Sequence, residues 1–345
     1  MKQSQVIALG VIATLLAGYL FLGRLNKKEP TNPVTPAIKE LYSRWKVEYK
    51  MNIGAAEDDY RLKTFSQNYD IINHHNNAPE TKYKLGLNQY AHLTLSEFAA
   101  LHLGYTKTKV NVPSNVTRKV CDNEGPLTVP DSIDWVAQGK VSKVKNQGRC
   151  GSCWAFSATG AIESVLAITT GTVDELSEQQ LVDCSTPYGN EGCNGGEMYK
   201  AFNYVADHGI VLESDYPYTG VDGQCNIPST ATKFLISGYR NVTANASDAL
   251  KTAVAKNPVS VGVQAASSEF QLYKSGVLTG DGCGIELDHG VLAVGYGTLN
   301  GTDFWKVKNS WGPAWGDQGY ILIERREGPG TCGINMEPMY PTHYC

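Results

Sequence analysis

Two cysteines three residues apart, Cys150 and Cys153, stand in the stretch KNQGRCGSCWAFS, which begins polar and becomes apolar. A pair at this spacing fits a thiol–disulfide redox centre, two metal ligands, or one half-cystine beside one nucleophile. The apolar run WAFSATGAIESVLAIT predicts a buried helix that begins at or just before Cys153. A thiol at that position lies at the positive end of the helix dipole, which favours the thiolate. Cys153 is therefore a candidate nucleophile.

A nucleophilic thiol needs a base, and His289 is the candidate that the later sequence offers. It begins the apolar run HGVLAVGYG, where its simplest interpretation is a satisfied core histidine. The motif NSWG, which begins at Asn309, favours a catalytic interpretation, because an Asn can accept the second imidazole N–H and a Trp can shield that bond. Gln147 precedes Cys153, and its amide together with the Cys153 backbone N–H could stabilise an oxyanion.

The elements that must position these residues fall into two groups along the chain. Ser177 and Gln180 form an S-x-x-Q capping box at the start of a second helix, and MYKAFNYVADHG ends on Gly209 as a third helix. Short apolar runs further on predict the strands of an antiparallel sheet: PVSVGVQA, HGVLAVGYG, DFWKVKNSW and YILIERR. Helices first and strands later indicate an α+β domain with two halves.

Charge is distributed unevenly along the chain. Residues 1–126 carry 16 Lys and Arg against 11 Asp and Glu, or +5, and residues 127–345 carry 14 against 23, or −9, which together give the net −4. The acidic C-terminal part argues against nucleic acid as a partner. The opposite signs predict attraction between the two parts.

An apolar sorting segment occupies residues 1–23. The run from Val6 to Leu22 is uncharged and is followed by several cations, so we expect a signal peptide or a signal anchor. Nine cysteines favour the secretory pathway, with a lysosome-like or digestive vacuole, or secretion, as the destination, and with membrane anchoring before processing as an alternative. N-glycosylation sequons fit the same compartment and begin at Asn115, Asn241, Asn245 and Asn300.

Four blocks, QGRCGSCWAFS, GCNGG, LDHGVLAVGYG and KNSWGPAWGDQGY, resemble the signature blocks of papain-like cysteine proteases. The resemblance covers about Val129 to Pro341. It implies a two-lobed α+β fold with a helical left lobe and an antiparallel β right lobe. The implied roles are Cys153 as nucleophile, His289 as general base and acid, Asn309 as orienting residue, Gln147 in the oxyanion hole and Trp311 as shield. The implied disulfides are Cys150–Cys193, Cys184–Cys225 and Cys283–Cys332. Cys121 and Cys345 fall outside that pattern, and either pair with each other or stay free.

The same resemblance implies an extended substrate site and a pocket, S2, for the P2 residue, the second residue before the cleaved bond. The residues placed against the substrate are Gly195, Gly196, Met198, Gly262, Leu287, Asp288, Gly290, Trp311 and Glu337, with Glu197 beside them. Glu337 falls at the S2 floor, and is either a solvated surface carboxylate or a group that lets a basic P2 residue bind beside apolar ones.

Helical periodicity dominates from Ile38 to about Asn77. This stretch resembles the inhibitory propeptide of cathepsin L-like proteases, since it fits the pattern E-x3-R-x3-F-x2-N-x3-I-x3-N at Glu57, Arg61, Phe65, Asn68, Ile72 and Asn76. The next block, GLNQYAHLT, departs from the family's G-x-N-x-F-x-D by Tyr90 for Phe and His92 for Asp. The expected division of the chain is an N-terminal segment at 1–23, a propeptide at 37–105, a linker with the processing site at 106–126 and a peptidase domain at 127–345.

The expected function is that of a cysteine endopeptidase, made as a zymogen and activated at acidic pH, with protein or peptide substrates. Its expected partners also include its own propeptide and cystatin-like inhibitors. No cofactor is expected, and no second C-x-x-C or paired His supports a zinc site. A thiol–disulfide oxidoreductase would leave His289, Asn309 and Gln147 unexplained, and a non-catalytic homologue would be expected to lack Cys153.

Overall fold

The computed structural model describes residues 34–106, 128–280 and 282–343. The expected sorting segment, nearly all of the expected linker, Cys121 and Cys345 lie outside these ranges. Within the described ranges, we find no helix with the length and apolar character needed to cross a membrane.

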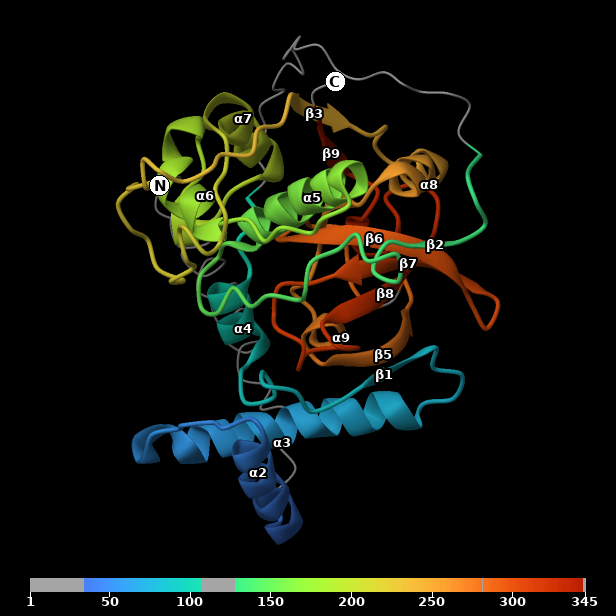
Figure 1. Cartoon of the computed structure of the whole chain (residues 1–345). Helices are drawn as coiled ribbons and strands as arrows, with labels where there is room; N and C mark the ends of the chain where they lie inside the picture. The colour runs from blue at the N-terminus through green and yellow to red at the C-terminus, as the bar shows by residue number, and fades with distance from the viewer. Residues whose placement is uncertain (1–33, 107–127, 281, 344–345) are drawn as a thin grey trace, which may run out of the picture.

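The N-terminal module, residues 36–105, is built from three helices and one short strand, coloured blue to teal in Figure 1. The predicted helical stretch is divided in two by a turn at residues 49–54, so that α2 and α3 cross each other. A capping box at the start of the third helix joins Thr94 to Glu97 through reciprocal hydrogen bonds. The elements are α2 (Pro36–Glu48), α3 (Ala55–Asn77), β1 (Tyr83–Leu85) and α4 (Leu95–His102).

Two asparagines of the propeptide-like pattern hold the chain that follows α3. The Asn68 side chain donates to the carbonyls of Ala91 and Leu93 at 2.8 and 2.9 Å. Asn76 bonds to both backbone groups of Leu85 at 2.8 and 3.0 Å. Asn68 therefore satisfies backbone carbonyls of the buried irregular segment before α4, and Asn76 fixes the end of β1 to α3.

Three helices form one half of the C-terminal domain. Their bounds are α5 (Cys153–Thr170), α6 (Glu178–Cys184) and α7 (Met198–His208), with the short turns η1 (Thr186–Tyr188) and η2 (Gly192–Asn194). The central helix α5 begins at Cys153 as predicted and is buried over its first fifteen residues, Cys153–Ala167. Figure 1 shows it between α6 and α7 on one side and the strands on the other. Only half of the predicted capping box forms, because Ser177 accepts from the Gln180 backbone while the Gln180 side chain bonds elsewhere.

The other half is a sheet that runs in the order β1-β5-β8-β7-β6-β4-β9-β3, with β2 paired to β6. All pairs are antiparallel except β5 with β8, which is parallel and departs from the predicted antiparallel sheet. The strands are β2 (Ile133–Asp134), β3 (Gly238–Asn241), β4 (Val259–Val263), β5 (Tyr273–Leu278), β6 (His289–Leu299), β7 (Thr302–Lys308), β8 (Tyr320–Glu324) and β9 (Met339–Thr342). The helices on this side are α8 (Ser247–Lys256), α9 (Ser268–Gln271) and the turn η3 (Thr331–Gly333).

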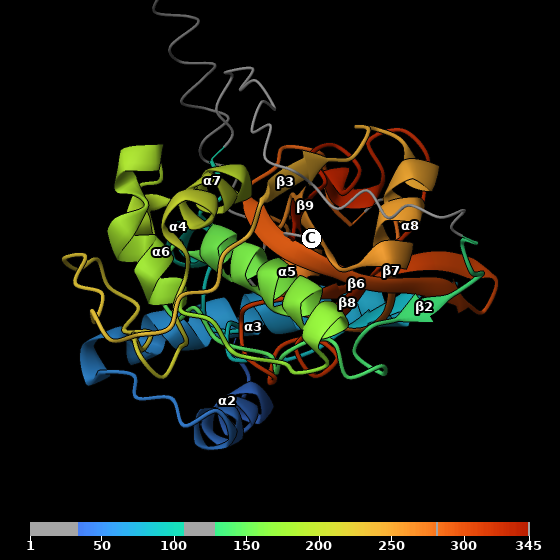
Figure 2. The same cartoon turned by 45° about the horizontal axis from the view of Figure 1, so that its top comes forward.

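The N-terminal module packs on the sheet half of the domain (Figures 1 and 2). Its strand β1 pairs with β5, and its buried aromatic residues as far as Phe98 share one core with the sheet. Phe98 of α4 meets the Trp311 ring edge-on, with ring centroids 5.0 Å apart. The module is therefore docked by a strand and by an aromatic core, which together place its last residues over the domain's two halves.

Candidate active site

Cys153 is the first residue of α5, and its side chain is fully buried. It is the cysteine without a disulfide among the described residues. Its sulfur accepts a hydrogen bond from the Gly290 backbone N–H at 3.4 Å, which joins the helical half to the start of β6. The thiol thus lies at the junction of the two halves, at the positive end of an eighteen-residue helix.

His289 and Asn309 are brought together by the neighbouring strands β6 and β7. His289 begins β6, and Asn309 follows the last residue of β7. The His289 Nε2 lies 2.8 Å from Asn309 Oδ1, which also accepts from the Ser310 backbone N–H at 2.8 Å. Because an amide oxygen can only accept hydrogen bonds, the Nε2 atom of His289 carries the proton in this bond. The basic nitrogen is then Nδ1, which has no hydrogen-bond partner in the described part of the chain.

The Trp311 ring covers His289. The two rings are stacked, with centroids 4.5 Å apart and planes inclined by 26°, and both side chains are fully buried. A ring in this position keeps water from the imidazole and its bond to Asn309.

Gln147 is fully buried near Cys150, and its side chain already has partners. Its Nε2 donates to the His102 carbonyl at 3.0 Å and to the Cys150 carbonyl at 2.9 Å. Its Oε1 accepts from the Ser310 hydroxyl at 2.6 Å, which fixes the direction of the amide. The donor that we predicted for an oxyanion is therefore occupied by a carbonyl of the N-terminal module. Ser310 was missed in the sequence analysis, although it lies within the NSWG motif.

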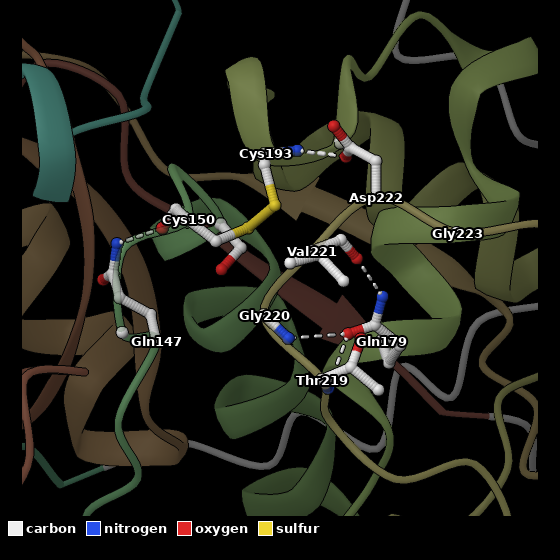
Figure 3. Close-up of a disulfide and its surroundings, with 12 residues drawn as sticks. Gln147, Cys150, Gln179, Cys193, Thr219, Gly220, Val221, Asp222 and Gly223 are labelled. Carbon is white, nitrogen blue, oxygen red and sulfur yellow. Dashed lines mark hydrogen bonds between the residues drawn. A yellow bond between two sulfur atoms is a disulfide. The ribbon is translucent and has the colours of Figure 1, made fainter.

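The structure contains the three disulfides that the resemblance implies. Cys150 pairs with Cys193, so the C-x-x-C sequence does not form a bond within itself. Figure 3 shows this disulfide between the segment after Gln147 and the turn η2. Asp222, from a separate loop, accepts a hydrogen bond from the Cys193 backbone N–H at 2.7 Å. The bridge therefore fixes the segment beside the thiol to the segment expected to bind substrate.

The end of the N-terminal module crosses the thiol as an extended chain. Gly104 and Tyr105 donate their backbone N–H groups to the Asp288 carbonyl at 3.2 and 3.0 Å, and Gly196 donates to the Gly104 carbonyl at 2.9 Å. The Gly104 backbone also contacts the Cys153 sulfur. A Cβ added to Gly104 would lie 2.5 Å from the carbonyl carbon of Gly151, so only glycine fits there.

Tyr105 fills the pocket that the resemblance assigns to the P2 residue. Its ring is buried in one core cluster with Met198, and Leu287 packs against that cluster. A Cβ added to Gly262 would lie 3.0 Å from the ring, and the Tyr105 hydroxyl donates to Glu337 at 2.6 Å. Two predicted pocket residues, Gly262 and Glu337, thus lie against the Tyr105 side chain, and Met198 and Leu287 belong to the surrounding apolar cluster.

The other predicted substrate residues lie close by with partners of their own. The Asp288 carboxylate accepts from the backbone of Ala265 and Ala266, at 2.7 and 3.1 Å, and Glu197 is paired with Lys200 at 2.8 Å. The left-handed φ of 126° at Gly195 suits glycine. Its loop continues into Gly196, which bonds to the N-terminal module as described above.

Burial makes both catalytic candidates neutral in this form. It raises the pKa of the Cys153 thiol to about 12 and lowers the pKa of His289 to about 4. This differs from the thiolate expected at a helix start, because burial outweighs the hydrogen bonds to sulfur that favour the charged form. Within the described ranges, no group of three or more His, Cys, Asp or Glu is placed to hold a metal ion.

Comparison with known proteins agrees with this geometry. Residues 129–342 match the family described as papain family cysteine protease, and residues 42–98 match the cathepsin propeptide inhibitor domain (I29). The chain is 45% identical over 312 residues to "Probable cysteine protease RDL2" of Arabidopsis thaliana, covering 88% of this chain and 85% of that protein. It is 43% identical over 312 residues to the KDEL-tailed cysteine endopeptidase CEP2 of Arabidopsis thaliana, covering 88% and 86%.

Among solved structures, digestive procathepsin L 3 from the larval midgut of Tenebrio molitor superposes with a TM-score of 0.79 at 37% identity, covering 89% of this chain and 99% of that one. That structure, like this one, contains the inhibitory segment. The two family matches together cover the domain that forms the cleft and most of the N-terminal module that packs on it. The chain therefore belongs to the papain family of cysteine proteases, and is a cathepsin L-like zymogen with its propeptide inhibitor domain in place.

Proposed function

We propose that the protein is an endopeptidase in which Cys153 is the nucleophile and His289 the general base and acid. The observation that carries this proposal is the free thiol at the start of α5, beside a histidine whose Nε2 is held by Asn309 at 2.8 Å. That bond orients the ring and leaves Nδ1 to take the thiol proton. Departure of the propeptide readmits water, which favours the charged thiolate and imidazolium over the neutral pair.

Hydrolysis then takes two steps. The thiolate forms a bond to the substrate carbonyl carbon, the peptide C–N bond breaks, and the imidazolium of His289 protonates the leaving amine. Water next attacks the thioester carbonyl carbon while His289 takes a proton from it, and the C–S bond breaks, which releases the acid and restores the thiolate and the imidazolium. In both steps the Gln147 amide and the Cys153 backbone N–H bind the oxyanion. The Gln147 amide becomes available for this when the His102 carbonyl leaves it.

Inhibition by the propeptide follows from the direction of its chain. In a substrate, the P2 residue precedes the residue whose carbonyl is attacked. In the propeptide, Tyr105 in the P2 pocket follows Gly104, which lies against Cys153. The propeptide therefore crosses the nucleophile in the reverse direction, and this supports its role as an intramolecular inhibitor that is not itself a substrate.

Activation at acidic pH is supported by the buried histidine that replaces the family's aspartate. His92 is packed against Trp45, faces Arg61 and Glu97 within the propeptide and Arg149 of the domain, and its Nδ1 has no partner among the described residues. Burial, with the two arginines, lowers the pKa of His92 to about 4. The docked form is thus fully stable above the ordinary pKa near 6.5 and loses stability as the pH falls toward 4. The charge difference between the two parts of the chain acts in the same direction.

The proposal also covers the processing site, the substrates, the inhibitors and the destination of the protein. Maturation would cut the chain near residues 125–129 and separate the propeptide at 37–105 from a peptidase domain at 127–345. Substrates would carry apolar or basic P2 residues, and cystatin-like inhibitors could occupy the same cleft. The KDEL-tailed relative supports the secretory pathway, with a lysosome-like or digestive vacuole, or secretion, as the destination.

The test is acid maturation of the purified zymogen, followed by titration with an epoxide affinity label and peptide mapping by mass spectrometry. We expect stoichiometric labelling of Cys153 with complete loss of peptidase activity, and a new N-terminus near residues 125–129. Labelling at another cysteine with activity lost, or a Cys150–Cys153 disulfide in the active enzyme, would refute the assignment.

A further inference from the structure

The propeptide places a tyrosine, not an aliphatic or basic residue, in the P2 pocket. Tyr105 is 5% exposed, and its hydroxyl donates to Glu337 Oε2 at 2.6 Å. This is a short bond to a carboxylate, the kind of neutral-to-charged hydrogen bond that is stronger than an ordinary one. The pocket therefore already holds a complementary ligand in the zymogen.

The walls of the pocket suit an aromatic ring. Gly262 leaves room for the ring, since a Cβ there would lie 3.0 Å from it. Met198 is fully buried in the same core cluster as Tyr105, and Leu287 packs against that cluster. Only the Tyr105 hydroxyl reaches a charged group, Glu337. The pocket therefore suits an aromatic ring that carries one hydrogen-bond donor at its tip.

The neighbouring acid does not compete for the hydroxyl. The Glu197 carboxylate is paired with Lys200 at 2.8 Å, and both are buried. Burial and the negative charge of Glu337 raise the pKa of Tyr105 well above its ordinary value, so the phenol keeps its proton and remains a donor.

We propose that Glu337 makes tyrosine the preferred P2 residue of the mature enzyme, by accepting a hydrogen bond from the phenol hydroxyl. This inference rests on the proposed function of the cleft and specifies its substrates. A phenylalanine at P2 would fill the same apolar walls and leave the carboxylate without this donor. A site built to bond a hydroxyl discriminates strongly against the analogue that lacks it.

The experiment measures kcat/KM of the mature enzyme on four peptides that differ only at P2, which is Tyr, Phe, Leu or Arg. Wild type, Glu337→Gln and Glu337→Leu are compared, with Glu327→Gln as the matched control because Glu327 is exposed. Active-site titration with the epoxide label normalises every preparation to its functional thiol. We expect Tyr to exceed Phe by about tenfold to a hundredfold in wild type and in the control.

In Glu337→Leu the Tyr-to-Phe ratio should fall to about one. Glu337→Gln keeps an acceptor without the charge, and its ratio should lie between the two. Equal wild-type rates on Tyr and Phe would overturn the inference, as would a ratio that survives in Glu337→Leu, or a preference for Arg above Tyr. Failure of the proposed function looks different, because no P2 peptide would then be cleaved and the label would not react with Cys153.

Discussion

Replacement of Gly104 by alanine should release the zymogen from inhibition without removing the propeptide. The added Cβ would lie 2.5 Å from the Gly151 carbonyl carbon and 2.6 Å from its Cα, and both are backbone atoms that cannot turn aside. Gly151 is itself held, since its N–H donates to the Cys193 carbonyl at 2.9 Å and Cys193 is in a disulfide. The propeptide strand must therefore move away from Cys153.

The size of the effect follows from the contacts that are lost. Moving the strand breaks the bond from Gly104 to Asp288 and the bond from Gly196 to Gly104, at about 1 kcal/mol each. Residual crowding adds about 1 to 3 kcal/mol. The docked state should thus lose about 3 to 5 kcal/mol, a factor of about 10² to about 4 × 10³ in the docking equilibrium.

The assay is the rate at which the epoxide label modifies Cys153 in the intact zymogen at pH 7, with the chain length checked by mass spectrometry. We expect labelling to accelerate by at least about a hundredfold in Gly104→Ala. Gly54→Ala is the matched control, because it lies in the propeptide and the described chain leaves the space around its Cβ position open to 4 Å. Labelling of Gly104→Ala at the wild-type rate would refute the view that this strand blocks the nucleophile.

Three further results are expected. His92→Gln should reduce the ratio of the maturation rate at pH 5 to that at pH 7 about tenfold, because the docked form then has no buried histidine that must stay unprotonated between pH 6.5 and 4. An unchanged ratio, or an equal change in the control His74→Gln at an exposed histidine, would contradict this. Gln147→Ala should lower kcat of the mature enzyme about a hundredfold with little change in KM, in steady-state peptide hydrolysis, and a change confined to KM would argue for a binding role instead. Lys145→Met should lower the free energy of unfolding of the zymogen, measured with denaturant, by about 3 to 5 kcal/mol, because it leaves two buried carboxylates, one of them Glu178 at 2.6 Å, without their cation. Adding Glu178→Gln should recover part of this loss, and no recovery would count against the explanation.

The sequence carried the local parts of the site. Cys153 begins its helix where the apolar run begins. The strand that begins at His289 and the neighbouring strand that ends just before Asn309 follow from short apolar runs in the sequence. Roles for these residues came from the family resemblance, and the expected protonation of Cys153 did not hold in the zymogen. That expectation considered only the helix, whereas burial dominates the pKa, and the N-terminal module lies over the thiol in this form.

Contacts between distant segments were beyond prediction from the sequence. Tyr105 lies 232 residues before Glu337, and no periodicity relates them. The same holds for the His102 carbonyl on Gln147 and for the parallel pairing of β5 with β8. Each depends on how the propeptide and the two halves dock, which is decided by packing across the whole chain.

The pairing of β1 with β5 means that activation also alters an edge of the sheet. In the zymogen β5 is an interior strand, between β1 and β8. Once the propeptide is gone, its outer backbone groups face water and become a template on which another extended chain can add. The exposed Lys274 and the left-handed Gly276 interrupt that template, as charges and irregular backbone do at protected sheet edges. Maturation therefore replaces a paired strand by an exposed edge strand that a charge and irregular backbone protect, and the tendency to self-associate should change together with activity.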